Sequence, residues 1–151
     1  MKSIRYVIAT MLLAAATVVG ATATASAAPY WQSYAKTNRF HCDEQVTWSP
    51  GVYSETCVVI NGTATQAVVI VDNYSGSAVN IEALNVRLWH NGTIASDVDC
   101  LASTLNTGNG RACFGPTKQF PCNHAVQAFS WINIGLGSDQ RLTDTFRMCV
   151  T

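Results

Sequence analysis

Short runs of β-branched and aromatic residues, separated by turn sequences, dominate this chain after its first third. Such residues favour strands over helices, and the Gly, Asn, Pro and Ser between them favour tight reversals. The clearest runs are Cys57–Ile60, Ala67–Val71, Val79–Trp89, Val126–Ile134 and Leu142–Val150. We therefore predict an all-β domain, an antiparallel β-sandwich or small barrel of about 7–9 short strands.

Six cysteines add a second constraint on the fold. They are Cys42, Cys57, Cys100, Cys113, Cys122 and Cys149. An even number in a small exported domain predicts three disulfides. A zinc site is the alternative, but zinc ligands favour closely spaced cysteine pairs that this chain lacks, so we expect no metal. The sequence alone leaves the connectivity open, and we predict the sequential pairing Cys42–Cys57, Cys100–Cys113 and Cys122–Cys149.

The first 27 residues have the pattern of a secretory signal peptide. Lys2 and Arg5 precede an apolar stretch over residues 6–20, and a small-residue cleavage sequence ends at Ala27. The stretch is shorter than the roughly 20 apolar residues of a membrane-spanning helix, although a retained anchor is the alternative. We predict a signal peptide over residues 1–27, a single disulfide-bonded domain over residues 28–151, and a secreted, extracellular protein with no membrane span after cleavage.

Composition and missing motifs exclude several classes of function. The chain has 9 Lys+Arg against 9 Asp+Glu, and 48% of its residues are hydrophobic. This balance excludes a basic nucleic-acid binder, and the hydrophobic content excludes a disordered chain. The sequence has no nucleophile elbow, metalloprotease motif, P-loop or dinucleotide-binding motif, so we predict no catalytic residue and no cofactor. Converging carboxylates leave a small secreted hydrolase as a third hypothesis.

A hairpin around Asn91-Gly92 is the best-specified local element. We predict a three-residue loop, His90–Gly92, because it pairs Leu88 with Ile94 and keeps one face of the hairpin apolar. The opposite face then carries polar and aromatic side chains, namely Asn85, Arg87, Trp89, Asp97 and Asp99. The two aspartates could hold calcium, but too few oxygen ligands accompany them. We interpret them as part of a solvated face beside Arg87.

The run Val126–Ile134 alternates in the same way. One set of alternate residues is apolar, whereas the other combines rings with amides: Gln127, Phe129, Trp131 and Asn133. Rings supply apolar area and amides fix orientation, a combination that suits sugar or peptide recognition. The predicted ligand-binding residues are Asn85, Arg87, Trp89 and Trp131. In a sandwich these rings could instead face inward and belong to the core.

The segment His41–Glu44 is a weaker candidate site. It places an imidazole near two carboxylates, which suits acid–base chemistry or metal binding. The cysteine between them is expected to be oxidised, and we interpret the segment as a polar loop beside a disulfide.

Two functional hypotheses follow. The leading one is a non-catalytic secreted β domain that binds an extracellular polysaccharide or protein surface through the aromatic and amide face. The alternative is a secreted effector, an enzyme inhibitor or toxin-like protein, that acts through disulfide-braced loops over Thr104–Arg111 and Ser49–Tyr53. The leader, the cysteines and the Thr/Asn-rich composition are typical of secreted bacterial β domains, but no family motif is present.

Overall fold

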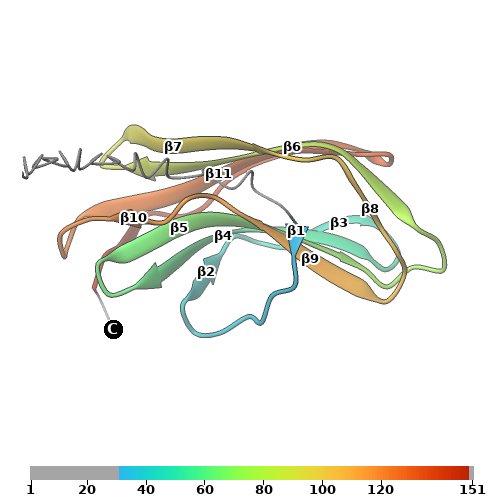
Figure 1. Ribbon diagram of the computed structural model, residues 1–151, viewed down its shortest axis with the longest axis horizontal. Helices are drawn as coiled ribbons and strands as arrows, with labels where there is room; N and C mark the ends of the chain where they lie inside the picture. The colour runs from blue at the N-terminus through green and yellow to red at the C-terminus, as the bar shows by residue number, and fades with distance from the viewer. Residues whose placement is uncertain (1–30, 150–151) are drawn as a thin grey trace, which may run out of the picture.

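The computed structural model describes residues 31–149, which form two antiparallel sheets packed face to face (Figure 1). Sheet I is seven-stranded and has the order β1 (Trp31–Gln32), β9 (Asn109–Phe114), β5 (Ala64–Asn73), β4 (Val52–Asn61) and β2 (Phe40–Cys42), with β10 (Lys118–Gln119) pairing with β5 and β3 (Val46–Ser49) with β4. Sheet II is six-stranded and has the order β12 (Gly137–Leu142), β11 (Ala125–Ile134), β6 (Val79–His90) and β7 (Thr93–Cys100), with β13 (Phe146–Arg147) pairing with β11 and β8 (Ser103–Leu105) with β6.

This architecture confirms the predicted all-β sandwich. Eight of the strands are four or more residues long, and the others are short edge segments. Within residues 31–149, no helix is long and apolar enough to cross a membrane. The predicted signal peptide, residues 1–27, lies outside the described residues.

The core lies between the sheets, and most of its buried residues come from β4, β5, β6 and β11. Along β11, every second residue from Val126 to Ile134 is buried. These side chains pack against Val69 and Val71 from the facing sheet, as expected for aligned sandwich packing. One polar pair crosses the core: the hydroxyls of Thr56 and Ser130 are 2.6 Å apart. These two hydroxyls therefore satisfy each other in the core.

All three predicted disulfide pairings are confirmed. Cys42–Cys57 joins β2 to β4 within sheet I, and Cys122–Cys149 joins the segment before β11 to the C-terminal turn. Cys100–Cys113 joins the end of β7 to β9 and therefore links the two sheets covalently. Cys100 and Cys113 are both buried, so this disulfide is part of the core.

The β6–β7 hairpin differs from the prediction. His90 pairs with Thr93, so the loop has two residues, and Asn91 and Gly92 both have positive φ (47° and 80°). This conformation is typical of the primed turns that Asn-Gly favours, and the predicted three-residue loop is wrong. A register shift follows at Leu88/Trp89, beyond which Leu88 pairs with Ser96. The extra residue of this bulge restores the alternation beyond it, so Asn85, Arg87, Asp97 and Asp99 share the polar face as predicted. Ile94 does not lie on the apolar face as predicted, because it pairs with Trp89 on the outer face.

The predicted strand over Leu142–Val150 is also wrong. Strand β12 ends at Leu142, and between it and Cys149 only Phe146–Arg147 forms a short strand. Thr143 ends the ladder because its hydroxyl accepts a hydrogen bond from the backbone amide of Ala128 at 3.0 Å. The strand that pairs with β11 here is Gly137–Leu142, whose mostly polar residues lack the apolar pattern of the other strands.

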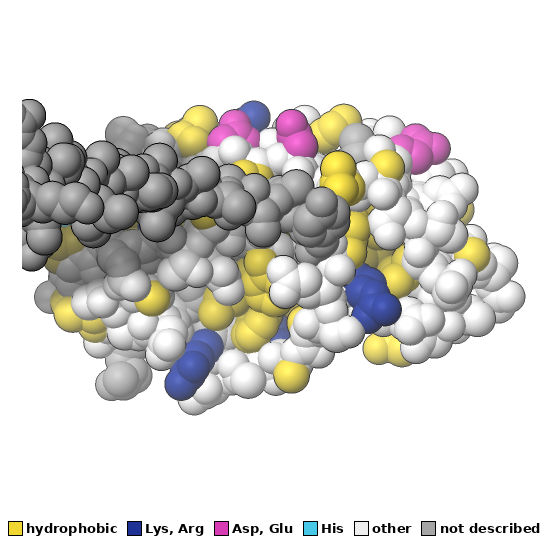
Figure 2. Space-filling model, in the orientation of Figure 1, with side chains coloured by type: hydrophobic (Ala, Val, Ile, Leu, Met, Phe, Trp, Pro, Cys, Tyr) yellow, Lys and Arg dark blue, Asp and Glu magenta, His cyan; other side chains and the backbone are white. Residues whose placement is uncertain are grey.

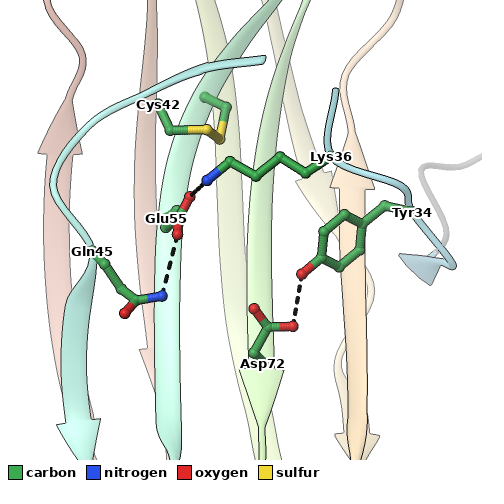
Figure 3. Close-up of polar contacts among 7 residues, drawn as sticks. Tyr34, Lys36, Cys42, Gln45, Glu55 and Asp72 are labelled. Atoms are coloured by element: carbon green, nitrogen blue, oxygen red, sulfur yellow. Dashed lines mark hydrogen bonds and ion pairs between the residues drawn. A yellow bond between two sulfur atoms is a disulfide. The ribbon is translucent and has the colours of Figure 1, made fainter. Parts of the chain in front are cut away.

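The outer face of sheet I carries a second, smaller core. Cys57, Val68, Ile70 and Ala112 are buried there under Tyr34, Phe40 and Cys42 from the N-terminal segment. Polar contacts hold this segment in place (Figure 3): Lys36 pairs with Glu55, and the Tyr34 hydroxyl donates to Asp72 Oδ1 at 2.7 Å. Gly110 lies opposite Asp72, where a Cβ atom would overlap the carboxylate.

The Tyr34 contact predicts a loss of stability at alkaline pH. Burial raises the pKa of Tyr34 above its usual value of 10.0, and the hydrogen bond and charge of Asp72 raise it further. Above about pH 10 the unfolded chain loses this proton first, so the free energy of unfolding should fall as the pH rises. Below that pH the contribution is fully present. Chemical unfolding at a series of pH values checks this, and Tyr34→Phe should show a shallower alkaline decrease; equal slopes would refute the assignment.

Candidate functional site

The outer face of sheet II aligns polar and aromatic side chains in rows across four strands. Residues that pair directly in antiparallel strands place their side chains on the same face. One row runs from β12 to β7 through Gln140, Trp131, Asn85 and Asp99. The adjacent row consists of Leu142, Phe129, Arg87 and Asp97. The alternation of β11 therefore places its rings outside the core, which resolves the alternative left open by the sequence.

A depression of about 350 Å³ lies over these two rows. Its lining residues are Asn85, Arg87, Asp99, Phe129, Trp131 and Gln140. Both rings are half-buried, whereas Asp99 and Gln140 are exposed. The depression thus combines aromatic surface with amide, guanidinium and carboxylate groups, and it is open to solvent on a flat sheet face.

Hydrogen bonds fix the polar groups of this face before any ligand arrives. Asn85 Nδ2 donates to Asp97 Oδ1 at 2.7 Å and to Asp99 Oδ1 at 2.9 Å. Arg87 Nε donates to Asp97 Oδ2 at 2.8 Å, and its guanidinium lies 5.3 Å from the centre of the Phe129 ring. The expected proximity of Arg87 to the aspartates is therefore present as an ion pair with Asp97. A surface held in this way loses little conformational entropy on binding.

The structure brings three of the four predicted site residues together and places the fourth beside them. Asn85, Arg87 and Trp131 line the depression. Trp89 lies on the same face in the next row, between Gln127 and Ile94, and does not line the depression. Its ring is half-buried, and its Nε1 has no hydrogen-bond partner among the described residues. Trp89 therefore forms a flank of the site.

Sequence reasoning missed Gln140. The residue reaches the depression because β12 pairs with β11, and the polar sequence of β12 hid that strand. The turn sequence Gly135–Gly137 directly after β11 is the signal that could have indicated a hairpin there.

The other candidate residues lie elsewhere. The His41 ring contacts Phe146 at a centroid distance of 4.9 Å. Among the described residues, one group of potential metal ligands lies close together, namely Cys42, Glu55 and Cys57. Both of its cysteines are in a disulfide (Figure 3). A disulfide leaves no thiolate to bind a metal.

Acidic side chains lie in and beside the depression. Asp97, Asp99 and Glu82 contribute carboxylates on this side of sheet II, and Arg87 pairs with Asp97. Figure 2 shows acidic side chains along the top of the molecule, over β6 and β7. A surface with this balance favours neutral or cationic ligands over anionic ones.

The fold and this face define a disulfide-bonded β-sandwich with an exposed aromatic and polar sheet surface. The sequence matches no known family model and no curated protein. Among solved structures, it has a distant likeness to the GAE domain of GGA2p from Saccharomyces cerevisiae. The TM-score is 0.32 and the identity 13%, with 70% of this chain and 96% of that chain covered. A likeness this low carries no argument about function.

Proposed function

We propose that this protein is a secreted, non-catalytic binding module that holds a carbohydrate chain on the outer face of sheet II. The observation that carries this proposal is the depression in which Phe129 and Trp131 lie beside Asn85, Arg87 and Gln140. A sugar ring has an apolar face of C–H groups and a rim of hydroxyls. Half-exposed aromatic rings suit the first, and fixed amide and charged groups suit the second.

The shape of the face favours an extended polymer over a small molecule. The depression is open and lies on a sheet, and apolar surface continues beyond it on both sides. Leu142 beside Phe129 is 51% exposed, and Ile94 beside Trp89 is 49% exposed. These residues extend the apolar strip from β12 to β7, so a chain of sugars could contact several strands at once.

The disulfides support the cellular location in this proposal. Three cystines in a small domain are compatible with an extracellular protein, because such bonds persist in oxidising compartments. Secretion through the predicted leader is part of the proposal. Intact mass measurement of the exported protein tests it, and a full-length product with six free thiols would contradict it.

Retention on insoluble polysaccharides tests the binding function. Purified oxidised protein is incubated with cellulose, chitin, chitosan and cell-wall preparations, and the bound fraction is measured. We expect retention on at least one polysaccharide and weaker retention of Trp89→Ala, which alters the flank of the depression. Retention on none of them, or capture only by immobilised proteins, would refute the proposal.

A second candidate function, the secreted effector, has one specific observation in its favour. The two loops predicted for it meet at one end of the sandwich around buried Asn73, whose Nδ2 donates to Leu105 O at 2.8 Å. The amide of Tyr74 donates to Gly51 O at 2.6 Å, which connects the loop at Ser49–Tyr53. Tyr74 is 63% exposed at this end. Inhibition of a protease or of bacterial growth, abolished by Tyr74→Ala, would support this function, and no inhibition would count against it.

A further inference from the structure

We infer that the carbohydrate held on the outer face of sheet II carries free amino groups, so that it is a cationic amino-sugar polymer. This inference rests on the proposed function and specifies its ligand. It depends on one row of the sheet, in which Trp131, Asn85 and Asp99 lie side by side on β11, β6 and β7. All three residues line the depression.

The adjacent row is already internally satisfied. Arg87 neutralises Asp97 through their ion pair, and the same guanidinium lies near the face of Phe129. A ligand cation would therefore gain little from the Asp97 carboxylate or the Phe129 ring, because the Arg87 guanidinium already interacts with both.

The row of Asp99 has no such compensation. Its carboxylate accepts a hydrogen bond from Asn85 Nδ2, but no Lys or Arg within residues 31–149 forms an ion pair with it. In the same part of the chain, no cation lies over the Trp131 ring. Glu82 likewise accepts from Asn133 Nδ2 at 3.1 Å and has no described cationic partner. The row thus offers a carboxylate and an aromatic ring to a cation from outside.

A protonated amino sugar satisfies both groups at once. Its ammonium can form a charge-assisted hydrogen bond with Asp99 and can approach the Trp131 ring, since tryptophan is the best aromatic partner for a cation. The C–H face of the same sugar can contact the ring, and Gln140 is available to its hydroxyls. An N-acetyl group removes the charge, so the acetylated polymer keeps the ring contact and loses the ion pair. A uronic acid polymer is repelled by Asp99 and Glu82.

Calorimetric titration with two matched oligomers tests the inference. A fully deacetylated β-1,4-linked glucosamine oligomer is compared with the N-acetylated oligomer of equal length, at a mildly acidic pH where the amine is protonated. We expect the deacetylated oligomer to bind at least about tenfold more tightly. Asp99→Asn should remove most of this preference, because it should weaken binding of the deacetylated oligomer far more than binding of the acetylated one. Glu44→Gln removes the same unit of charge from an exposed loop of sheet I and should leave the preference intact.

The outcomes separate this inference from the proposed function. Equal affinities of the wild-type protein for both oligomers, or a preference that survives in folded Asp99→Asn, would overturn the amino-sugar inference. Retention on a neutral polysaccharide would then still support the binding module. Binding to a lysine-rich peptide but to no polysaccharide would overturn both.

Discussion

Trp131→Ala is expected to weaken carbohydrate binding by at least about 30-fold, or about 2 kcal/mol. Trp131 lies on β11, one of the two middle strands of sheet II, in the same row as Asn85 and Asp99 and beside Phe129 in the depression. Half-buried aromatic anchors of this kind carry much of the energy of binding sites. Affinity is measured by calorimetry with a soluble fragment of the polysaccharide that retains the wild-type protein. Trp131→Phe should bind the carbohydrate more tightly than Trp131→Ala and less tightly than the wild type, because it keeps a smaller aromatic ring.

Tyr74→Ala is the matched control for this experiment. It also removes an exposed ring, but the ring belongs to the loops at one end of the sandwich and not to the outer face of sheet II. Its carbohydrate affinity should equal that of the wild type. A folded Trp131→Ala protein that binds as tightly as the wild type would rule out this face as the site.

Replacing both Cys100 and Cys113 with alanine is expected to lower the free energy of unfolding by about 3 kcal/mol. The two cysteines are 13 residues apart, and their bond is the described disulfide that joins sheet II to sheet I. In the chain-entropy account, its removal gives the unfolded chain additional conformations. The value is measured from chemical unfolding curves of the oxidised proteins, which retain the other two disulfides.

The double replacement of Cys42 and Cys57 provides the comparison. That pair closes a similar loop, with a separation of 15 residues, but it joins neighbouring strands of one sheet. If entropy of the unfolded chain dominates, the two double variants should lose similar stability. A loss well below about 1 kcal/mol from both would contradict the chain-entropy account.

Much of the fold could be predicted from the sequence because its strongest signals are local. The alternation in β11 predicted which residues are buried, but it left open whether the rings of the other set face outward or inward, and the structure shows them outside the core. The sequential disulfide pairing is confirmed although the sequence alone left the connectivity open, and the link between the sheets was not predicted. It depends on which sheet each strand joins, and Cys100 and Cys113 belong to different sheets.

The details of the site depended on features that the sequence conceals. The two-residue loop and the bulge each shift the β6–β7 register by one residue from the predicted one, which together places Asp97 opposite Arg87 and Asp99 opposite Asn85. This shift decides which aspartate gains a cationic partner. Gln140 was missed for a different reason, because the edge strand β12 carries the ion pair Asp139–Arg141 opposite the buried residues of β11 and therefore has no apolar pattern.

The most direct measurement of the binding face is an NMR titration of the protein with a soluble glucosamine oligomer. The account predicts that shifted amide resonances cluster on β6, β7, β11 and β12, and that the Trp131 indole N–H resonance shifts with them. Shifts confined to the loops around Tyr74 or to the Tyr34 and Glu55 side of sheet I, with the Trp131 indole resonance unmoved, would contradict it.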